Sequence, residues 1–239
     1  MLTPQSAYEN RLLRHMRASD LDLLAPHLVA QKLPLRHIVE KSQTPVAEVY
    51  FLESGLASIV AKMPDGRDIE VGISGNDGMT SSAVVLGGMQ SPHDSYIQVA
   101  GDGYSIATVH LQHAMETSKT LRNYLLLYVH TMIVQTASTA LANGQASVAA
   151  RMARWLLMVH DRTHGPEIVL THEFLAIMLG VRRPWVTETL HVLEDKRLIR
   201  AKRGLITIVD RAGLIAEADG FYGVAEKEYR RLLGVNLAR

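Results

Sequence analysis

The glycines are spread unevenly along this chain, and their positions restrict how each part of it can fold. None of the 17 glycines precedes Gly55, nine lie from Gly55 to Gly103, and no other occurs before Gly144. Glycine supplies the positive φ angles of tight turns and weakens helices. The distribution therefore predicts strands and turns in the middle of the chain and helices on either side of it.

Short β-rich segments alternate with the glycines of the middle part. We expect five strands, over residues 46–52, 56–61, 68–73, 95–100 and 104–109. Asp65 and Gly66 lie between two of these segments and predict a hairpin, because both tolerate positive φ. Short strands joined by glycine-rich turns are typical of an antiparallel β jelly roll or barrel. Before this part, residues 9–29 have the apolar spacing of one or two short helices.

Residues 111–142 contain no glycine or proline and have the apolar period of one long helix. Two stripes run along it, which predicts a helix sandwiched between its own barrel and a second copy of the chain. The stripe assigned to the barrel consists of Leu126, Val129, Ile133, Ala137 and Leu141. The stripe assigned to the dimer seam has a 3,4 repeat and consists of Leu121, Leu125, Tyr128, Met132, Gln135 and Thr139. The alternative is a helix buried within one subunit.

A helix break after residue 142 suggests two domains. Asn143 and Gly144 interrupt the helical pattern, and Ser147 can cap a new helix. We therefore expect one domain over residues 1–143 and a second over residues 144–239, joined by a hinge between helices.

Residues 171–193 predict a helix-turn-helix. Thr171 can cap the first helix, Gly180 supplies the turn, and Pro184 suits the first turn of the second helix, where a missing N–H has no cost. Residues 196–209 follow as a basic β-hairpin, so the whole reads as a winged helix-turn-helix.

The second helix of this motif has the polar side chains expected of a helix in the major groove of DNA. Arg183, near its N-terminus, suits the two hydrogen-bond acceptors of guanine. The candidates for base readout are Arg183, Thr187, Glu188 and His191. The candidates for phosphate contact are Thr171, His172, Arg182, Arg200, Lys202 and Arg203.

Charge is distributed in a way that fits a separate nucleic-acid module. Residues 1–148 carry 10 Lys and Arg against 13 Asp and Glu, a net charge of −3. Residues 149–211 carry 11 against 7, a net charge of +4, and residues 212–239 balance at 4 against 4. The chain thus has an acidic front and a basic back half.

Together these features resemble the bacterial Crp/Fnr transcription regulators over nearly the whole chain. The resemblance includes the strand pattern, the long helix and the stretches ARWLL (153–157), LGVRRPWVT (179–187) and LI (198–199). It implies an α+β fold: an N-terminal antiparallel β jelly roll like cyclic-nucleotide-binding domains, a central dimerisation helix and a C-terminal winged helix-turn-helix. It also implies a homodimer on a two-fold symmetric site in double-stranded DNA, and we expect RNA polymerase as a further partner.

The resemblance extends to individual positions of the second helix. Arg183 matches the family's guanine-reading arginine. Pro184 and Glu188 stand where well-known members carry a glutamate and an arginine, so the target sequence should differ.

The signal that controls this regulator is not evident from the sequence. In cyclic-AMP-binding members a glutamate and an arginine hold the ribose and phosphate; here the glutamate is missing and Asp94 stands at the arginine position. An aspartate would repel a phosphodiester, so cyclic AMP is disfavoured, and a cyclic-nucleotide-responsive regulator remains the alternative. The candidate effector-pocket residues are Ser81, Ser82, Ser95 and Thr136.

Several other classes of function lack the residues that they need. The chain has no cysteine, which excludes disulfides and cysteine-held iron–sulfur clusters. His110 with His113 and His160 with His164 have helical metal-ligand spacing, but no third ligand is evident, so we expect no metal or other defined cofactor. A cupin-like barrel enzyme would need a His-x-His cluster, which is absent, and no other catalytic motif occurs; we expect no enzyme activity.

The expected location is the cytoplasm. The N-terminus has no signal-peptide pattern, and no apolar run of membrane-spanning length was identified.

Overall fold

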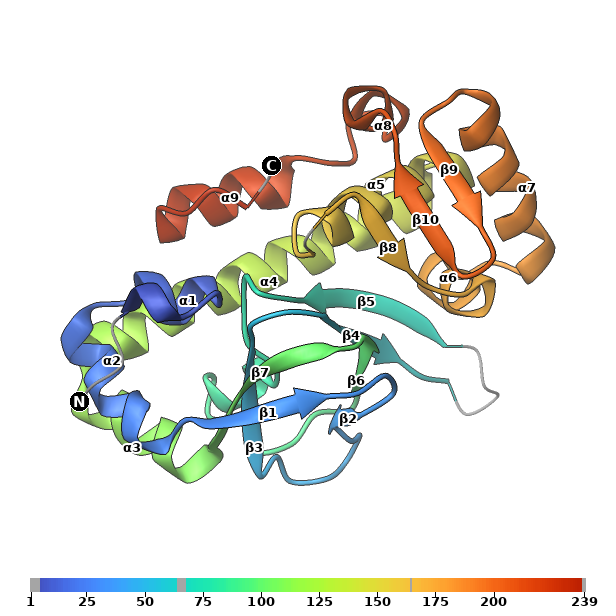
Figure 1. Cartoon of the computed structure of the whole chain (residues 1–239). Helices are drawn as coiled ribbons and strands as arrows, with labels where there is room; N and C mark the ends of the chain where they lie inside the picture. The colour runs from blue at the N-terminus through green and yellow to red at the C-terminus, as the bar shows by residue number, and fades with distance from the viewer. Residues whose placement is uncertain (1–4, 64–67, 164, 238–239) are drawn as a thin grey trace.

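A computed structural model describes residues 5–63, 68–163 and 165–237. The fold is α+β, as expected: a β-roll at one end, a winged helix-turn-helix at the other, and the long helix α4 (Lys119–Gln145) running from one to the other (Figure 1).

Two antiparallel sheets form the β-roll, with strand orders β1-β7-β3 and β2-β6-β4-β5. Side chains from both sheets, among them Leu33, Leu52 and Ile97, pack between them. All five expected strands are present, and the sequence analysis missed β1 and β2. The expected Asp65-Gly66 hairpin lies outside the described residues. The strands are β1 (Val29–Leu33), β2 (Ile38–Glu40), β3 (Glu48–Leu52), β4 (Leu56–Ala61), β5 (Ile69–Ser74), β6 (Asp94–Val99) and β7 (Gly101–Ala107).

Short helices flank the roll. The expected helix over residues 111–142 is in fact two helices, which meet at Ser118. Ser118 is extended, donates a hydrogen bond to Asp20 Oδ1 (2.6 Å) and caps α4 by accepting one from Leu121 N (3.2 Å). The bond to Asp20 holds Ser118 against another helix, and the bond from Leu121 N caps α4, so the first helix ends and the next begins at this residue. The helices and turns are η1 (Gln5–Ala7), α1 (Arg11–His15), α2 (Ala18–Leu24), η2 (Ala25–His27), η3 (Ser82–Val84) and α3 (Thr108–Thr117).

The burial of the two stripes of α4 differs from the prediction. Leu121, Leu125, Tyr128, Met132 and Gln135 of the expected dimer seam are buried inside this one chain, and Thr139 is half-buried. Of the stripe assigned to the barrel, Val129 is buried and Leu126 half-buried, whereas Ile133, Ala137 and Leu141 are exposed.

Hydrogen bonding explains why the first stripe faces inward. Gln135 Oε1 accepts from Ile73 N (2.7 Å), and Tyr128 Oη accepts from Met79 N (3.1 Å) and donates to Met79 O (2.9 Å). Backbone groups of the roll that face α4 therefore need the polar atoms that only this stripe carries.

By length and composition alone, α4 would also suit a membrane crossing, which the sequence analysis did not anticipate. One face of the helix is packed against the protein through polar as well as apolar side chains, as in the core helices of globular domains.

The break predicted at Asn143 and Gly144 is wrong: α4 continues through both and ends at Gln145, where the second part of the chain begins. Ser147 caps α5, Thr171 caps α6, and Gly180 ends α6 at φ 60°, all as the sequence predicts. Strand β8 was not anticipated; it pairs with β10, so the wing is a three-stranded sheet of order β8-β10-β9. The elements are α5 (Val148–His160), β8 (Glu167–Val169), α6 (His172–Leu179), α7 (Arg183–Asp195), β9 (Ile199–Lys202), β10 (Leu205–Ile208) and α8 (Arg211–Glu217).

The last helix, α9 (Val224–Leu233), leaves the winged helix and returns to lie along α4 (Figure 1). Tyr229 and Leu233, with Val235 and Leu237 beyond the helix, join the hydrophobic core formed by α4, the N-terminal helices and the roll. The sequence analysis assigned residues 144–239 to one domain, but this segment packs in the core of the first. An amphipathic helix can bury its apolar face on whichever surface its linker reaches, and here that surface is α4.

A buried carboxyl group joins the β-roll to α5. Glu70 of β5 is 4% exposed and accepts hydrogen bonds from Trp155 Nε1 (2.7 Å) and Ser58 Oγ (2.6 Å). Burial raises the pKa of Glu70 to about 8, against the opposing effect of these hydrogen bonds and of Arg154. Ser58 Oγ also contacts Gln98 Oε1. The junction is therefore built around a neutral carboxyl group.

This arrangement predicts a pH-dependent stability. The folded-state pKa of Glu70 lies above its ordinary value of 4.5, so its stabilising contribution is complete below about pH 4.5 and is lost as the pH rises through about 8. Glu70→Gln, which imitates the protonated form, should remove this loss. The free energy of unfolding of the parent should fall relative to the variant by up to about 1.4 kcal/mol per pH unit in that window.

Urea unfolding at pH 5, 6.5 and 8 measures the difference. Glu116→Gln, at an exposed carboxylate of α3, is the matched control and should follow the parent. If the difference in the free energy of unfolding between the parent and Glu70→Gln stays constant from pH 5 to pH 8, Glu70 is not neutral in the folded protein.

Candidate nucleic-acid interface

Helix α7 has one face fixed in the core and the other free. Val186, Leu190 and Leu193 are buried at the spacing of a helical stripe, as predicted, and Pro184 lies in the first turn. Arg182 and Arg183 are exposed at the helix start. Arg182 and Arg183 lie between the Gly180 turn and Pro184, so the turn places both side chains at the N-terminus of α7.

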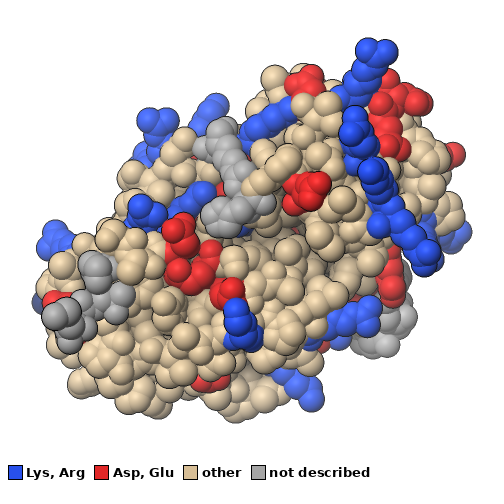
Figure 2. Space-filling model, viewed as in Figure 1, with Lys and Arg blue, Asp and Glu red and all other residues tan. Residues whose placement is uncertain are grey.

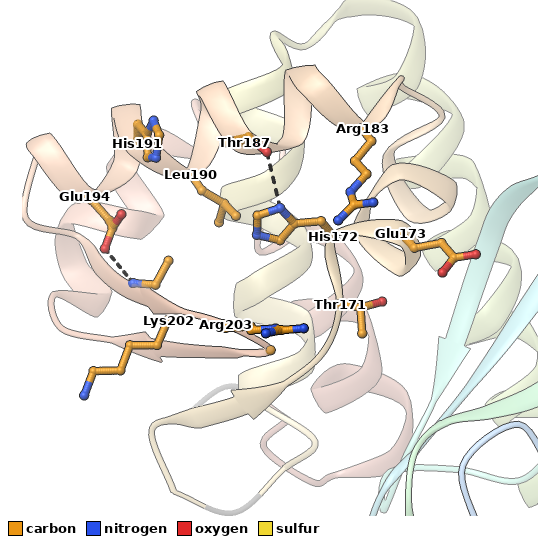
Figure 3. A pocket seen from close by; sticks show the side chains of 12 residues that line it. Thr171, His172, Glu173, Arg183, Thr187, Leu190, His191, Glu194, Lys202 and Arg203 are labelled. Carbon is orange, nitrogen blue, oxygen red and sulfur yellow. Dashed lines mark hydrogen bonds between the residues drawn. The ribbon is translucent and has the colours of Figure 1, made fainter.

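A groove of about 780 Å³ lies between α7, the start of α6 and the wing. Arg183 extends from α7 toward His172, and Arg203 enters the same space from the wing (Figure 3). The groove is lined by Thr171, His172, Glu173, Arg183, Thr187, Leu190, His191, Glu194, Ala201, Lys202, Arg203 and Gly204.

Most of the residues predicted to contact DNA meet in this groove. Thr187 and His191 share the groove-facing side of α7 with Arg183, because they follow it at helical spacing. Arg182, Glu188 and Arg200 are exposed but do not line the groove. The groove thus separates a central group of candidates from three peripheral ones.

Two hydrogen bonds fix the walls of the groove. His172 Nδ1 lies 3.3 Å from Thr187 Oγ1, which joins the start of α6 to the middle of α7. Glu194 Oε1 accepts from Ala201 N at 2.7 Å, which joins the end of α7 to the wing. The sequence analysis did not select Glu194, although its helical spacing from Arg183 and His191 places it on the same face.

The surface around the groove is rich in cations. Figure 2 shows Lys and Arg side chains gathered over the winged helix-turn-helix at the upper right, with acidic side chains beside them. Arg182, Arg183, Arg200, Lys202 and Arg203 are all exposed there. Such a surface favours a polyanion.

Comparison with known proteins agrees with this geometry. Residues 150–217 match the family model of the Crp-like helix-turn-helix domain. A putative Crp/Fnr regulator from Eubacterium rectale has 20% identity and a TM-score of 0.68, covering 87% of this chain and 98% of its own. FixK2 from Bradyrhizobium japonicum has 14% identity and a TM-score of 0.68, covering 79% of this chain and 96% of its own. The chain has the Crp/Fnr regulator fold.

The c-di-GMP-responsive global regulator CLP of Xanthomonas campestris has the same Crp/Fnr fold. Its identity is 20% and its TM-score 0.62, over 80% of this chain and 99% of its own. No curated protein sequence matches the chain.

In this Crp/Fnr fold a second groove, of about 490 Å³, lies between the β-roll and α4. Three of the four candidate effector residues line it: Ser81, Ser82 and Thr136. Ser95 does not, because it is buried within β6, between β2 and β4.

The structure also changes the role expected of Asp94. Its carboxylate pairs with Lys62 Nζ (2.7 Å) and accepts from Ser42 N (2.8 Å), and it does not line the groove. Burial raises its pKa, but the bonds from Lys62 and Ser42 outweigh that effect and lower the pKa overall. Asp94 therefore does not repel a ligand in this groove as the sequence analysis supposed.

The two histidine pairs singled out from the sequence differ in what the structure describes. Among the described residues, no group of three His, Cys, Asp or Glu side chains is arranged to hold an ion. His110 stacks on His27, with ring centroids 3.9 Å apart. The pair of His160 and His164 cannot be assessed, because His164 lies outside the described residues.

The contact between Glu194 and the wing yields a prediction. Glu194→Ala leaves the N–H of Ala201 without its acceptor and should lower the free energy of unfolding by about 1–2 kcal/mol. Glu188→Ala, an exposed glutamate of the same helix, should change it by less than about 0.5 kcal/mol. Urea unfolding of both variants tests this, and equal effects would show that the bond does not hold the wing.

Proposed function

We propose that this protein is a sequence-specific DNA-binding transcription regulator that acts as a homodimer on a two-fold symmetric site. The observation that carries the proposal is the convergence of Arg183 on α7 with Lys202 and Arg203 on the wing at one exposed groove. A helix and a basic hairpin so arranged suit a major groove and the phosphates beside it.

The residues have different parts in this proposal. Arg183 reads a guanine through its two acceptors, with Thr187, His191 and the peripheral Glu188 as further base contacts. Lys202 and Arg203 contact phosphates, as do Arg182 and Arg200 at the edges of the surface. Thr171 and His172 lie at the N-terminus of α6, where unpaired N–H groups favour a phosphate.

Dimer formation is proposed through the exposed face of α4. Ile133 and Leu141 are 57% and 52% exposed, and Ala137 lies between them on the same face, with the half-buried Leu126 about two turns before Ile133. These side chains follow one another at intervals of seven, four and four residues, as in helices that pack along a seam. The exposed stripe therefore replaces the buried one as the proposed interface.

The β-roll is proposed as the sensor part, with the groove beside α4 as its effector site. No enzyme activity and no fixed cofactor belong to this proposal. RNA polymerase remains the expected partner, and the cytoplasm the expected location.

Arg183→Ala should weaken binding to the preferred DNA sequence by about 1–3 kcal/mol and relax the preference at one base pair of each half-site. Lys202→Ala should instead weaken binding to all sequences and reduce the slope of log affinity against log salt by about 1. Fluorescence anisotropy on sites selected from a random library measures both. Arg14→Ala, at an exposed arginine of α1, should match the parent, and unchanged specificity in Arg183→Ala would refute the readout role.

Ile133→Glu should dissociate the dimer, because each subunit would bury a carboxylate at the helix crossing. We expect the dimer dissociation constant to rise about 100-fold or more, which corresponds to about 2.7 kcal/mol. Val109→Glu on α3, where the side chain is 65% exposed, is the control and should stay dimeric. Sedimentation equilibrium tests the pair; a dimeric Ile133→Glu protein would exclude this face of α4.

A further inference from the structure

The groove between the β-roll and α4 is built mainly from apolar side chains. The roll contributes Ile59, Val71 and Ala83, and α4 contributes Val129, Met132, Ile133, Ala137 and Ala140. Its volume of about 490 Å³ lies within the range of small-molecule sites. The size of the groove and its apolar lining suit a ligand that consists mostly of hydrocarbon.

Two polar atoms at this groove have no hydrogen-bond partner among the described residues. Ser81 is 4% exposed, and its Oγ is buried and unpaired; Nδ1 of His93 is buried and unpaired as well. Both residues line the groove. A buried polar atom without a partner is unfavourable, so a ligand that supplies one gains affinity from it.

Ser81 is held in place by its backbone. Its φ of 56° puts it in the left-handed region, directly before η3, which a serine adopts only when its surroundings impose it. The unpaired hydroxyl is therefore a fixed feature of the groove.

The charges of the groove disfavour an anion. Among the described residues, no Lys or Arg lines it, and the one carboxylate that does belongs to Glu40 of β2. Lys62, which directly follows β4, is engaged with Asp94 instead. A phosphate or carboxylate in this groove would meet no Lys or Arg of the described residues and would face Glu40.

We propose that this groove binds a largely apolar ligand without negative charge, whose polar end hydrogen-bonds to Ser81 and His93. The inference rests on the proposed role of the β-roll as sensor and defines the chemical class of its effector. It separates this site from one made for a cyclic nucleotide, whose phosphate requires a cation.

Three probes of different charge and polarity test the ligand class on the full chain: octan-1-ol, octanoate and cyclic AMP. Isothermal titration calorimetry should give saturable binding of octan-1-ol. Binding of octanoate, which has the same chain length with a negative end, should be at least ten-fold weaker, and cyclic AMP should not bind. Octanoate or cyclic AMP binding as tightly as octan-1-ol would overturn the proposal.

Two variants locate the site. Val71→Trp fills the groove from β5 and should abolish binding of octan-1-ol, whereas Val29→Trp, on an exposed position of β1, should leave it unchanged. Ser81→Gly removes the hydroxyl, and glycine tolerates the positive φ at this position. This variant should bind octan-1-ol about five-fold more weakly or worse, without loss of stability. Octan-1-ol binding that persists in Val71→Trp would show that it binds elsewhere.

The outcome is independent of the DNA-binding test. Loss of DNA binding in Arg183→Ala together with no binding of octan-1-ol to the parent would retain the regulator and refute only the ligand class. Binding of octan-1-ol together with unchanged DNA recognition in Arg183→Ala would retain the ligand class and refute the assigned readout.

Discussion

Asp77 and Arg162 form an ion pair at the point where the β-roll, α5 and α9 meet. Nε and Nη2 of Arg162 lie 3.0 and 2.8 Å from the two carboxylate oxygens of Asp77, and both side chains are 2% exposed. Burial lowers the pKa of Arg162, but Asp77, Glu226 and Asp161 outweigh that effect and raise it. Removing one partner of such a pair leaves an uncompensated buried charge, which typically costs about 3–5 kcal/mol.

Neighbouring residues hold Asp77 and Arg162 in contact. Oδ1 of Asp77 accepts from Gly75 N (2.9 Å), and the Asp77 carbonyl accepts from Tyr229 Oη of α9 (2.6 Å). A Cβ atom at Gly75 would lie 2.7 Å from Arg162 Cβ, so only glycine allows α5 to approach this closely. The loop of the β-roll that carries Gly75 and Asp77 thus helps to fix the orientation of the winged helix-turn-helix relative to the roll.

The α9 segment and the Glu70–Trp155 bond reinforce the same junction from two other directions. Arg11 donates to the carbonyls of Asn236 (3.3 Å), Leu237 (3.2 Å) and Asp161 (3.0 Å), which connects the two ends of the chain at this place. Helix α4 packs on β5 of the roll, on α5 and on α9, so one continuous set of contacts connects the groove beside α4 with the winged helix-turn-helix. The proposed ligand and dimer sites both use the outer face of α4, so occupancy of one should be felt at the other.

What the sequence by itself determined lies mostly in interactions between near neighbours. The caps at Ser147 and Thr171, the Gly180 turn and the buried stripe of α7 each depend on residues a few positions apart, and so the helix-turn-helix and its central candidates could be predicted. The tertiary structure decided which stripe of α4 faces inward, where α9 packs, and that Asp94 pairs with Lys62. It also decided that Ser81 and Thr136 share a groove with His93 while Ser95 does not. These outcomes depend on hydrogen bonds and packing between segments far apart in the chain, which hydrophobic period and turn chemistry do not encode.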